Sequence, residues 1–127
     1  MIKKVLIIFF LPLFVYAQDG NPDYPWQRLF ADENISVKFI FYSKADNSNN
    51  GVVIKLENKL AVETEFSFRL IFKSLQEEKS QIVSGLLKPN EIITGSSRGL
   101  FFIPFPDGKS ISELGITDIK IGIINLD

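Results

Sequence analysis

The stretch Glu65-Phe-Ser-Phe-Arg-Leu-Ile-Phe-Lys73 decides the fold class of this chain. Apolar side chains stand at positions 66, 68, 70 and 72 and alternate with polar ones, and only Ile71 is out of step. Successive side chains of an extended strand point to opposite faces. The two-residue period therefore predicts a β-strand with one buried face and one solvated face.

Further strand patterns lie on both sides of this stretch, and turns separate them. Asp46-Asn-Ser-Asn-Asn-Gly51 and Pro106-Asp-Gly108 have turn composition, because Asn, Asp and Gly tolerate a left-handed backbone and Pro fixes φ. A single helical turn is expected at residues 111–114. The predicted strands cover residues 35–42, 52–57, 65–73, 80–87, 91–94, 100–105 and 118–126.

About seven short strands without a convincing helix predict an all-β fold, an antiparallel β-sandwich. From about residue 34 to 126 the chain resembles the immunoglobulin-like and fibronectin-type modules of exported bacterial proteins. The resemblance rests on the strand count and on Val53-Ile-Lys-Leu-Glu-Asn58 followed by the Phe-rich strand. It implies an immunoglobulin-like β-sandwich, and a fold of this kind implies no particular activity.

The first residues have the pattern of a bacterial export signal. Met1-Ile-Lys-Lys4 is basic, residues 5–16 are apolar, and Val15-Tyr16-Ala17 places small residues at the −3 and −1 positions of a signal-peptidase site. The apolar run is shorter than the about 20 residues that a membrane-spanning helix needs. We therefore expect cleavage near Ala17, no membrane anchor in the mature form, and a periplasmic or extracellular location.

The chain divides into a signal peptide (1–17), an N-terminal arm (18–33) and a β-sandwich domain (34–127). The arm is polar and has neither helical nor strand periodicity, and its Trp26, Leu29 and Phe30 are expected to pack against the domain. An exported domain with no cysteine cannot use disulfides. Its stability must therefore come from apolar burial.

Composition excludes several kinds of chemistry. The chain has no His and no Cys, so Ser-His-Asp and Cys-His nucleophiles and His-based zinc sites are impossible. Lys and Arg number 14 against 15 Asp and Glu, without a basic cluster, so nucleic acid is not expected as a partner. Gly108-Lys-Ser110 imitates the end of a phosphate-binding loop, but Ile103 stands where that motif requires glycine. We expect no enzymatic activity, cofactor or metal.

The segment 46–57 coincides in spacing with an EF-hand calcium loop that would end at Glu57. The flanking alternation predicts strands rather than helices, and an extended chain would hold Glu57 too far away to complete the site. Two interpretations of the loop stay open. One is a weak oxygen site made by Asp46, Asn47 and Asn50, and the other is a plain Asn-rich hairpin tip.

The strip Gly99-Leu-Phe-Phe-Ile-Pro-Phe-Pro-Asp-Gly-Lys-Ser110 is apolar on both alternating faces. Packing against one sheet cannot cover both faces. We expect the rest to be covered from inside the molecule, by the arm with Trp26 or by a loop, and contact with another molecule is the alternative. The candidate partner-binding residues are Trp26, Phe101, Pro104, Phe105 and Pro106.

These patterns favour an exported, non-enzymatic binding or accessory module that engages a protein or glycan. Its contact would use the end loops, the strip or an exposed sheet edge that accepts a strand. The first alternative is a self-associating structural subunit of an envelope assembly, with the strip as its interface. The second is a small carbohydrate-active enzyme that uses carboxylates such as Glu63 and Glu65.

Overall fold

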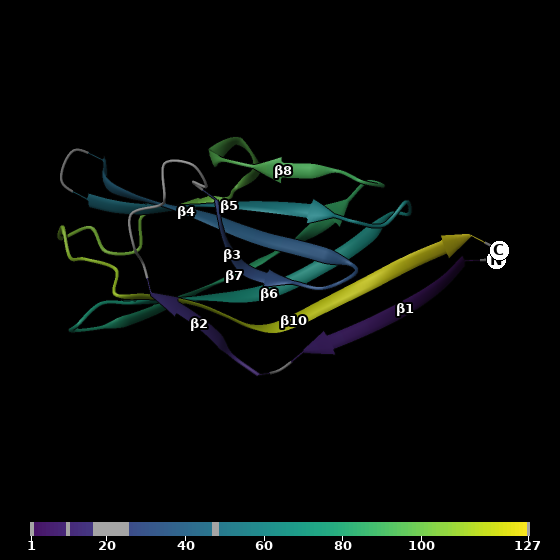
Figure 1. Ribbon diagram of the computed structural model, residues 1–127, viewed down its shortest axis with the longest axis horizontal. Helices are drawn as coiled ribbons and strands as arrows, with labels where there is room; N and C mark the ends of the chain where they lie inside the picture. The colour runs from purple at the N-terminus through teal and green to yellow at the C-terminus, as the bar shows by residue number, and fades with distance from the viewer. Residues whose placement is uncertain (1, 10, 17–25, 47–48, 127) are drawn as a thin grey trace.

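The computed structural model describes residues 2–9, 11–16, 26–46 and 49–126, which form two antiparallel β-sheets packed as layers (Figure 1). The predicted all-β sandwich is confirmed, with ten strands in the described residues rather than about seven. The strands are β1 (Ile2–Phe9), β2 (Leu13–Tyr16), β3 (Gln27–Ala31), β4 (Ile35–Asp46), β5 (Asn49–Asn58), β6 (Thr64–Lys73), β7 (Glu78–Leu87), β8 (Ile92–Thr94), β9 (Phe101–Phe102) and β10 (Glu113–Leu126).

Each sheet mixes hairpin neighbours with strands from distant parts of the chain. The first sheet has the order β3-β4-β5-β8, and β9 also pairs with β5. The second has the order β1-β10-β6-β7, and β2 also pairs with β10. The chain therefore crosses between the layers from β2 to β3, from β5 to β6, from β7 to β8 and from β9 to β10.

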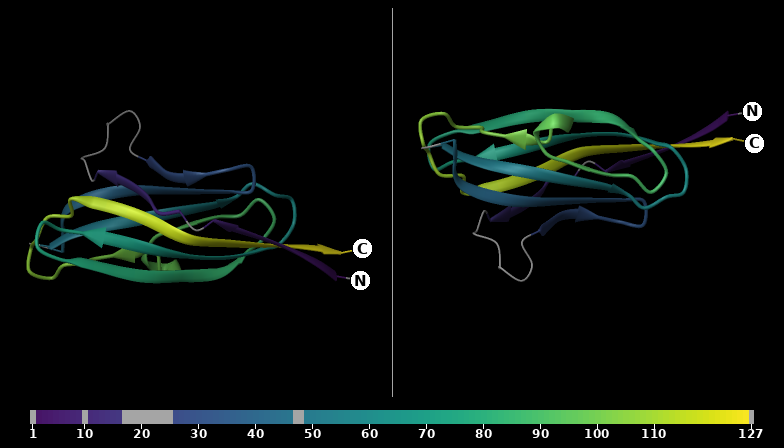
Figure 2. Two further views of the ribbon diagram at one scale, coloured as in Figure 1. Left: turned by 90° about the horizontal axis from the view of Figure 1, so that it is seen from below. Right: turned by 90° about the horizontal axis from the view of Figure 1, so that it is seen from above.

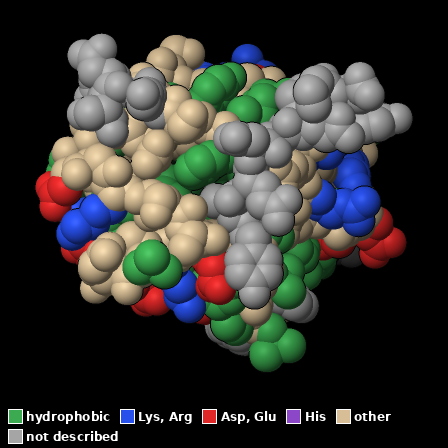
Figure 3. Space-filling view, turned by 60° about the vertical axis from the view of Figure 1, so that its left-hand side comes forward, with side chains coloured by type: hydrophobic (Ala, Val, Ile, Leu, Met, Phe, Trp, Pro, Cys, Tyr) green, Lys and Arg blue, Asp and Glu red, His purple; other side chains and the backbone are tan. Residues whose placement is uncertain are grey.

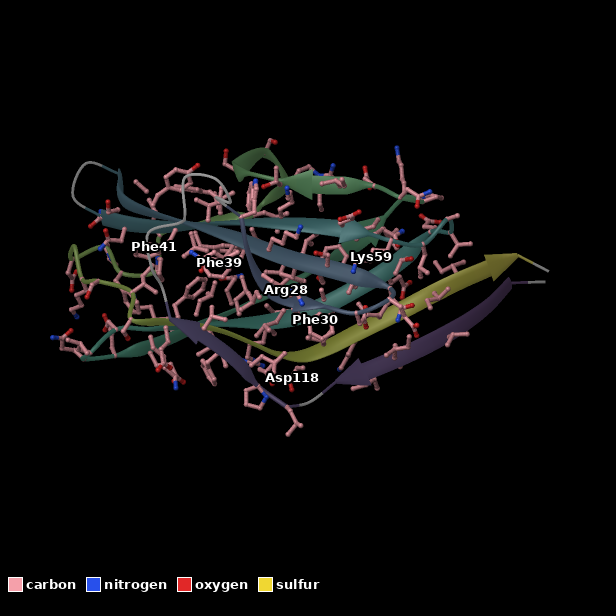
Figure 4. All side chains as sticks on the ribbon, in the orientation of Figure 1. Arg28, Phe30, Phe39, Phe41, Lys59 and Asp118 are labelled. Carbon is pink, nitrogen blue, oxygen red and sulfur yellow. The ribbon has the colours of Figure 1, made fainter. Side chains whose placement is uncertain are left out.

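The core lies between the two layers and is formed by the alternating residues that the sequence indicated. Every second side chain of β6 is buried, and β4 and β5 meet that face with Phe39 and Ile54, both fully buried. Phe39 and Phe41 on β4 and Phe30 on β3 point into the space between the layers (Figure 4). Complete burial of one such side chain stabilises the fold by about 1.5–3 kcal/mol.

A β-bulge interrupts β10, the longest strand. The pairing with β6 shifts register between Thr117 and Lys120, and Asp118 has a left-handed φ of 53°. Buried side chains therefore change parity along β10, from Leu114 and Ile116 to Ile119 and Ile121. One extra residue in a strand has this effect on side-chain direction.

The expected helical turn at residues 111–114 is wrong. Ile111 and Ser112 lead directly into β10, and the Ser112 amide donates to the Lys73 carbonyl at 2.7 Å. Ile111 and Leu114 are both buried. Their spacing resembles a helical repeat, but they enter the core from a non-helical lead-in and from a strand.

Part of the N-terminal arm is a strand rather than irregular chain. Strand β3 pairs with β4, and Leu29 is buried. Trp26 and Phe30 are half-buried, and Phe30 packs against the core as expected. Residues 18–25 of the arm lie outside the described residues.

The apolar amino-terminal segment lies along one edge of the second sheet. Strand β1 pairs with residues 119–126 of β10, and β2 pairs with residues 113–116. Strands β1 and β10 run side by side and bring both ends of the chain to the same side of the molecule (Figure 2). Among the described residues there is no helix with the length and hydrophobicity to cross a membrane. Cleavage near Ala17 stays a prediction.

A buried asparagine joins two loop segments at one end of the sandwich. The Asn58 side chain is 1% exposed, and its Nδ2 donates to the carbonyls of Val62 and Lys88, each at 2.9 Å. Its Oδ1 accepts from the Leu60 amide at 3.0 Å and from Thr64 Oγ1 at 3.3 Å. Through these four hydrogen bonds Asn58 fixes the β5–β6 connection to the segment that follows β7.

Candidate functional site

The apolar strip divides between the inside and the outside of the molecule. Leu100 and Phe105 are 1% exposed and belong to the core, whereas Phe101 and Pro104 are half-buried. Pro106 is exposed in the turn that follows. The strip does not alternate along its whole length, because β9 contains only residues 101–102. A partner can therefore contact Phe101, Pro104 and Pro106, while Phe105 holds the strip in place from below.

Phe101 ends an apolar row on the outer face of the first sheet. It pairs with Val53, and Val53 pairs with Ile40. Gln27 pairs with Phe39, so the next position, Trp26, falls opposite Ile40 at the far end of the row. All four side chains are half-buried. We call Trp26, Ile40, Val53 and Phe101 the outer row.

The outer row explains one residue that departs from the strand pattern. Ile40 interrupts the alternation of β4 because it faces outward, toward Val53 rather than toward the core. The ammonium of Lys55 lies 4.5 Å from the centroid of the Trp26 ring, which is within cation–π range. The row therefore joins two of the sequence-predicted residues, Trp26 and Phe101, through two residues that the sequence analysis did not select.

On its inner side the strip borders a small hollow beside β7. Phe102 faces the core, and its ring centroid is 5.7 Å from that of Phe72 on β6. The hollow has a volume of about 220 Å³ and is lined by Phe72, Lys79, Ser80, Gln81, Phe102, Ile103 and Pro104. Strand β7 is an edge strand of the second sheet, and its Lys79 and Gln81 are exposed beside the hollow. Figure 3 shows hydrophobic side chains that reach the surface of one face, with charged residues toward its rim.

The turn after the strip is fixed by polar contacts. Asn49 Oδ1 accepts from the Gly108 amide, and Asn50 Nδ2 donates to the Lys109 carbonyl, both at 3.0 Å. Lys109 Nζ donates to Glu77 Oε1 at 3.0 Å and lies 3.4 Å from Asp107 Oδ2. The hydrogen bond to Glu77 raises the pKa of Lys109 above its usual 10.5, against a lowering by burial, and Asp107 adds to the rise.

These contacts bear on the two interpretations of the Asn-rich loop. Residues 49–58 form β5, so the backbone is extended up to Glu57, as an EF-hand loop is not. Asn49 and Asn50 direct their side chains to the turn at residues 108–109. No cluster of three or more acidic residues suited to a metal occurs in the part of the chain that the structure describes. Asn47 lies outside that part.

Neither a protein-family model nor a curated protein matches the chain. Its function must therefore be argued from the surfaces described above.

Proposed function

We propose that this protein is an exported, non-enzymatic binding module that holds a protein or glycan partner against the outer row. The observation that carries the proposal is the row itself: four partly exposed apolar side chains in line across a rigid sheet, with an aromatic residue at each end. Aromatic side chains give large contact area at a low entropic cost, which suits recognition. Export is proposed from the amino-terminal pattern.

The pairing order supports an immunoglobulin-like assignment of the sandwich. Strands β4, β5 and β8 with β9 correspond in order and pairing to A, B and E of that fold, and β6, β7 and β10 correspond to C, C′ and F. Strands β1 and β2 lie at the position of strand G, beside F. Modules with this architecture serve many functions, so the proposed function depends on the outer row and not on the fold.

Site-specific crosslinking tests the proposal. A photoreactive amino acid at Val53 lies in the middle of the outer row, and the same amino acid at Ile82 lies on the exposed face of β7 as a matched control. We expect the Val53 probe, and not the Ile82 probe, to crosslink to a distinct envelope component in the native host. Equal products from both positions, or products made only of this chain, would contradict the proposal.

Intrinsic fluorescence gives a second readout that also detects a glycan. Trp26 is the only tryptophan of the chain, so its emission reports directly on the row. Adding the crosslinked partner, or the glycan released from the crosslink, is expected to shift the Trp26 emission of the wild-type protein. Val53→Lys should abolish the shift, because it places a charge in the centre of an apolar contact. Ile82→Lys should leave it unchanged.

A further inference from the structure

The outer face of β10 has a space over Gly115 that holds one aromatic ring, and we call this space the seat. Phe14 of β2 pairs with Gly115, and a Cβ atom at Gly115 would lie 2.5 Å from Phe14 Cδ1. Carbon atoms do not approach so closely without repulsion, so the ring fills space that only glycine leaves free. The Lys73 ammonium lies 4.1 Å from the ring centroid. Ile71, the residue that breaks the pattern of β6, pairs with Gly115 on its other side.

The two neighbours of Phe14 point to the opposite face and close the core. Leu13 pairs with Ile116 and Val15 pairs with Leu114, and both are half-buried against the hydrophobic core. The triplet Leu13-Phe14-Val15 therefore binds β10 in two ways. Its aliphatic side chains seal the gap between the layers, and its aromatic side chain occupies the seat.

This triplet belongs to the predicted signal peptide. Cleavage near Ala17 would remove β1 and β2, which are the only neighbours that the described structure places on this edge of β10. The edge would then present unpaired backbone groups, the buried side chains of Leu114 and Ile116, and the empty seat at Gly115. Exposed apolar edges of this kind attract a further strand.

We propose that β10 of the exported chain is a strand-acceptor site for an extended segment of a second exported protein. The segment carries an aliphatic–aromatic–aliphatic triplet in the place of Leu13-Phe14-Val15 and runs antiparallel to β10. This inference rests on the proposed export and cleavage, but it concerns a different surface from the outer row. The side chains required of the donor segment are inferred from β2, which fills the site in the full chain.

A second copy of this chain does not meet the requirements of the site. Strand β10 contains no aromatic residue, so pairing between two copies of β10 would leave the seat empty. The nearest equivalent of the triplet in the arm is Leu29-Phe30-Ala31, but Leu29 is 4% exposed and Phe30 packs against its own core. A donor with a free aromatic residue must therefore come from another protein.

The test uses the protein recovered from the exported fraction and synthetic peptides. The probe peptide contains Leu13-Phe14-Val15-Tyr16 with added lysines at both ends for solubility, and the control peptide has Ala in place of Phe14. Two protein variants are compared with the wild type. Gly115→Ala blocks the seat, and Gly85→Ala, on β7 of the same sheet, is the matched control, since its Cβ would meet only the Phe66 ring, at 3.3 Å.

The seat predicts a specific pattern of affinities, measured by isothermal titration calorimetry. The wild-type protein and the Gly85→Ala variant should bind the probe peptide equally. Gly115→Ala should bind the probe peptide at least about tenfold more weakly, which corresponds to about 1.4 kcal/mol. The Ala control peptide should bind weakly to every protein and should not distinguish Gly115→Ala from the wild type, because no ring then meets the added methyl group. Backbone amides of residues 113–116 should gain hydrogen-exchange protection when the probe peptide is added, and should not gain it when the Ala control peptide is added.

The contrary outcomes separate the two proposals. If mass spectrometry finds residues 2–16 still attached to the exported protein, the acceptor site is refuted, because the chain fills its own site, and the outer row is unaffected. If the leader is removed and the folded protein does not bind the probe peptide, or Gly115→Ala binds it as well as the wild type, the acceptor site is refuted and the outer row is unaffected. A dimer with residues 113–116 protected in the absence of peptide also refutes it, in favour of self-association.

Discussion

Arg69 reaches from β6 to the bulge of β10, where its Nε lies 3.5 Å from the Asp118 carboxylate. Both side chains are more than two-fifths exposed, so the ion pair itself contributes little to stability. The backbone conformation of Asp118 decides more, because its φ of 53° lies in a region that most L-residues adopt only at a cost in free energy. Figure 4 marks Asp118 on the outer side of β10.

The bulge predicts an unusual order of stabilities for substitutions at Asp118. Asp118→Gly should be tolerated, since glycine adopts positive φ freely. Asp118→Val should lower the free energy of unfolding by about 1–2 kcal/mol, because a β-branched residue is strained in this conformation. Urea denaturation measures both, with Thr117→Val as the control in an ordinary strand conformation. Equal stability of the Gly and Val variants would show that the bulge does not impose this φ.

The hydrogen bonds of the Asn58 side chain, which we call the asparagine hub, predict a large loss of stability from one substitution. Asn58→Ala removes four hydrogen bonds and leaves the part-buried Leu60 amide without its partner, while the Val62 and Lys88 carbonyls keep their bonds from Thr64 Oγ1 and the Glu91 amide. We expect a loss of about 2–3 kcal/mol of unfolding free energy, because each hydrogen bond contributes about 0.5–1.5 kcal/mol and the Leu60 amide is left unpaired. Denaturant melts measure the loss, with Ser84→Ala, at an exposed position of β7, as the comparison. A change within about 0.5 kcal/mol would refute the hub as a stabilising element.

The division of the strip into core and surface predicts a large loss of stability at one residue and a small loss at its neighbour. Phe105→Ala should destabilise the protein by about 3–5 kcal/mol, because it leaves a cavity in a packed interior. Pro106→Ala should lower the stability by at most about 1 kcal/mol, because only the fixed φ of an exposed turn residue is lost. Thermal unfolding followed by circular dichroism distinguishes them. Comparable losses for the two variants would contradict the buried position of Phe105.

The raised pKa of Lys109 predicts that the stability of the fold depends on pH in the alkaline range. Its pKa is raised in the folded state by the hydrogen bond to Glu77, with a further contribution from Asp107. The stabilisation is therefore fully present below pH 10.5, the usual lysine value, and is lost as the pH rises through the raised pKa. The difference in denaturation midpoint between wild type and Lys109→Met should be small at neutral pH, in favour of wild type, and should vanish above that pKa. A difference that persists there would mean that the lysine acts through its aliphatic stem.

Much of the sandwich could be predicted from sequence because burial on one face imposes a two-residue period. Burial alternates without interruption along residues 66 to 72 of β6, although Ile71 breaks the sequence pattern, and the strand was predicted almost to its ends. The period fails where the geometry changes. The bulge at Asp118 shifts the apolar positions of β10 by one residue, so its first half was not recognised.

The two isoleucines that broke the pattern contained the information that the sequence analysis did not use. Ile40 lies in the outer row, and Ile71 lies beside Gly115 and the Phe14 ring. The sequence of one strand does not reveal the role of a single apolar residue on its solvated face, because the residues that pack beside it come from distant segments. Trp26 and Phe101 were selected from composition, but Ile40 and Val53 needed the register of β3, β4, β5 and β9 to connect them.

The pairing of β1 and β2 with β10 has a kinetic consequence under the proposed export. The same apolar residues cannot lie in the sheet and in the membrane translocation channel at one time. A precursor that folds to completion pairs its own targeting sequence with β10 in the second sheet. Export then requires that the secretion machinery binds the nascent chain before the sandwich folds. Substitutions that slow folding should therefore speed secretion.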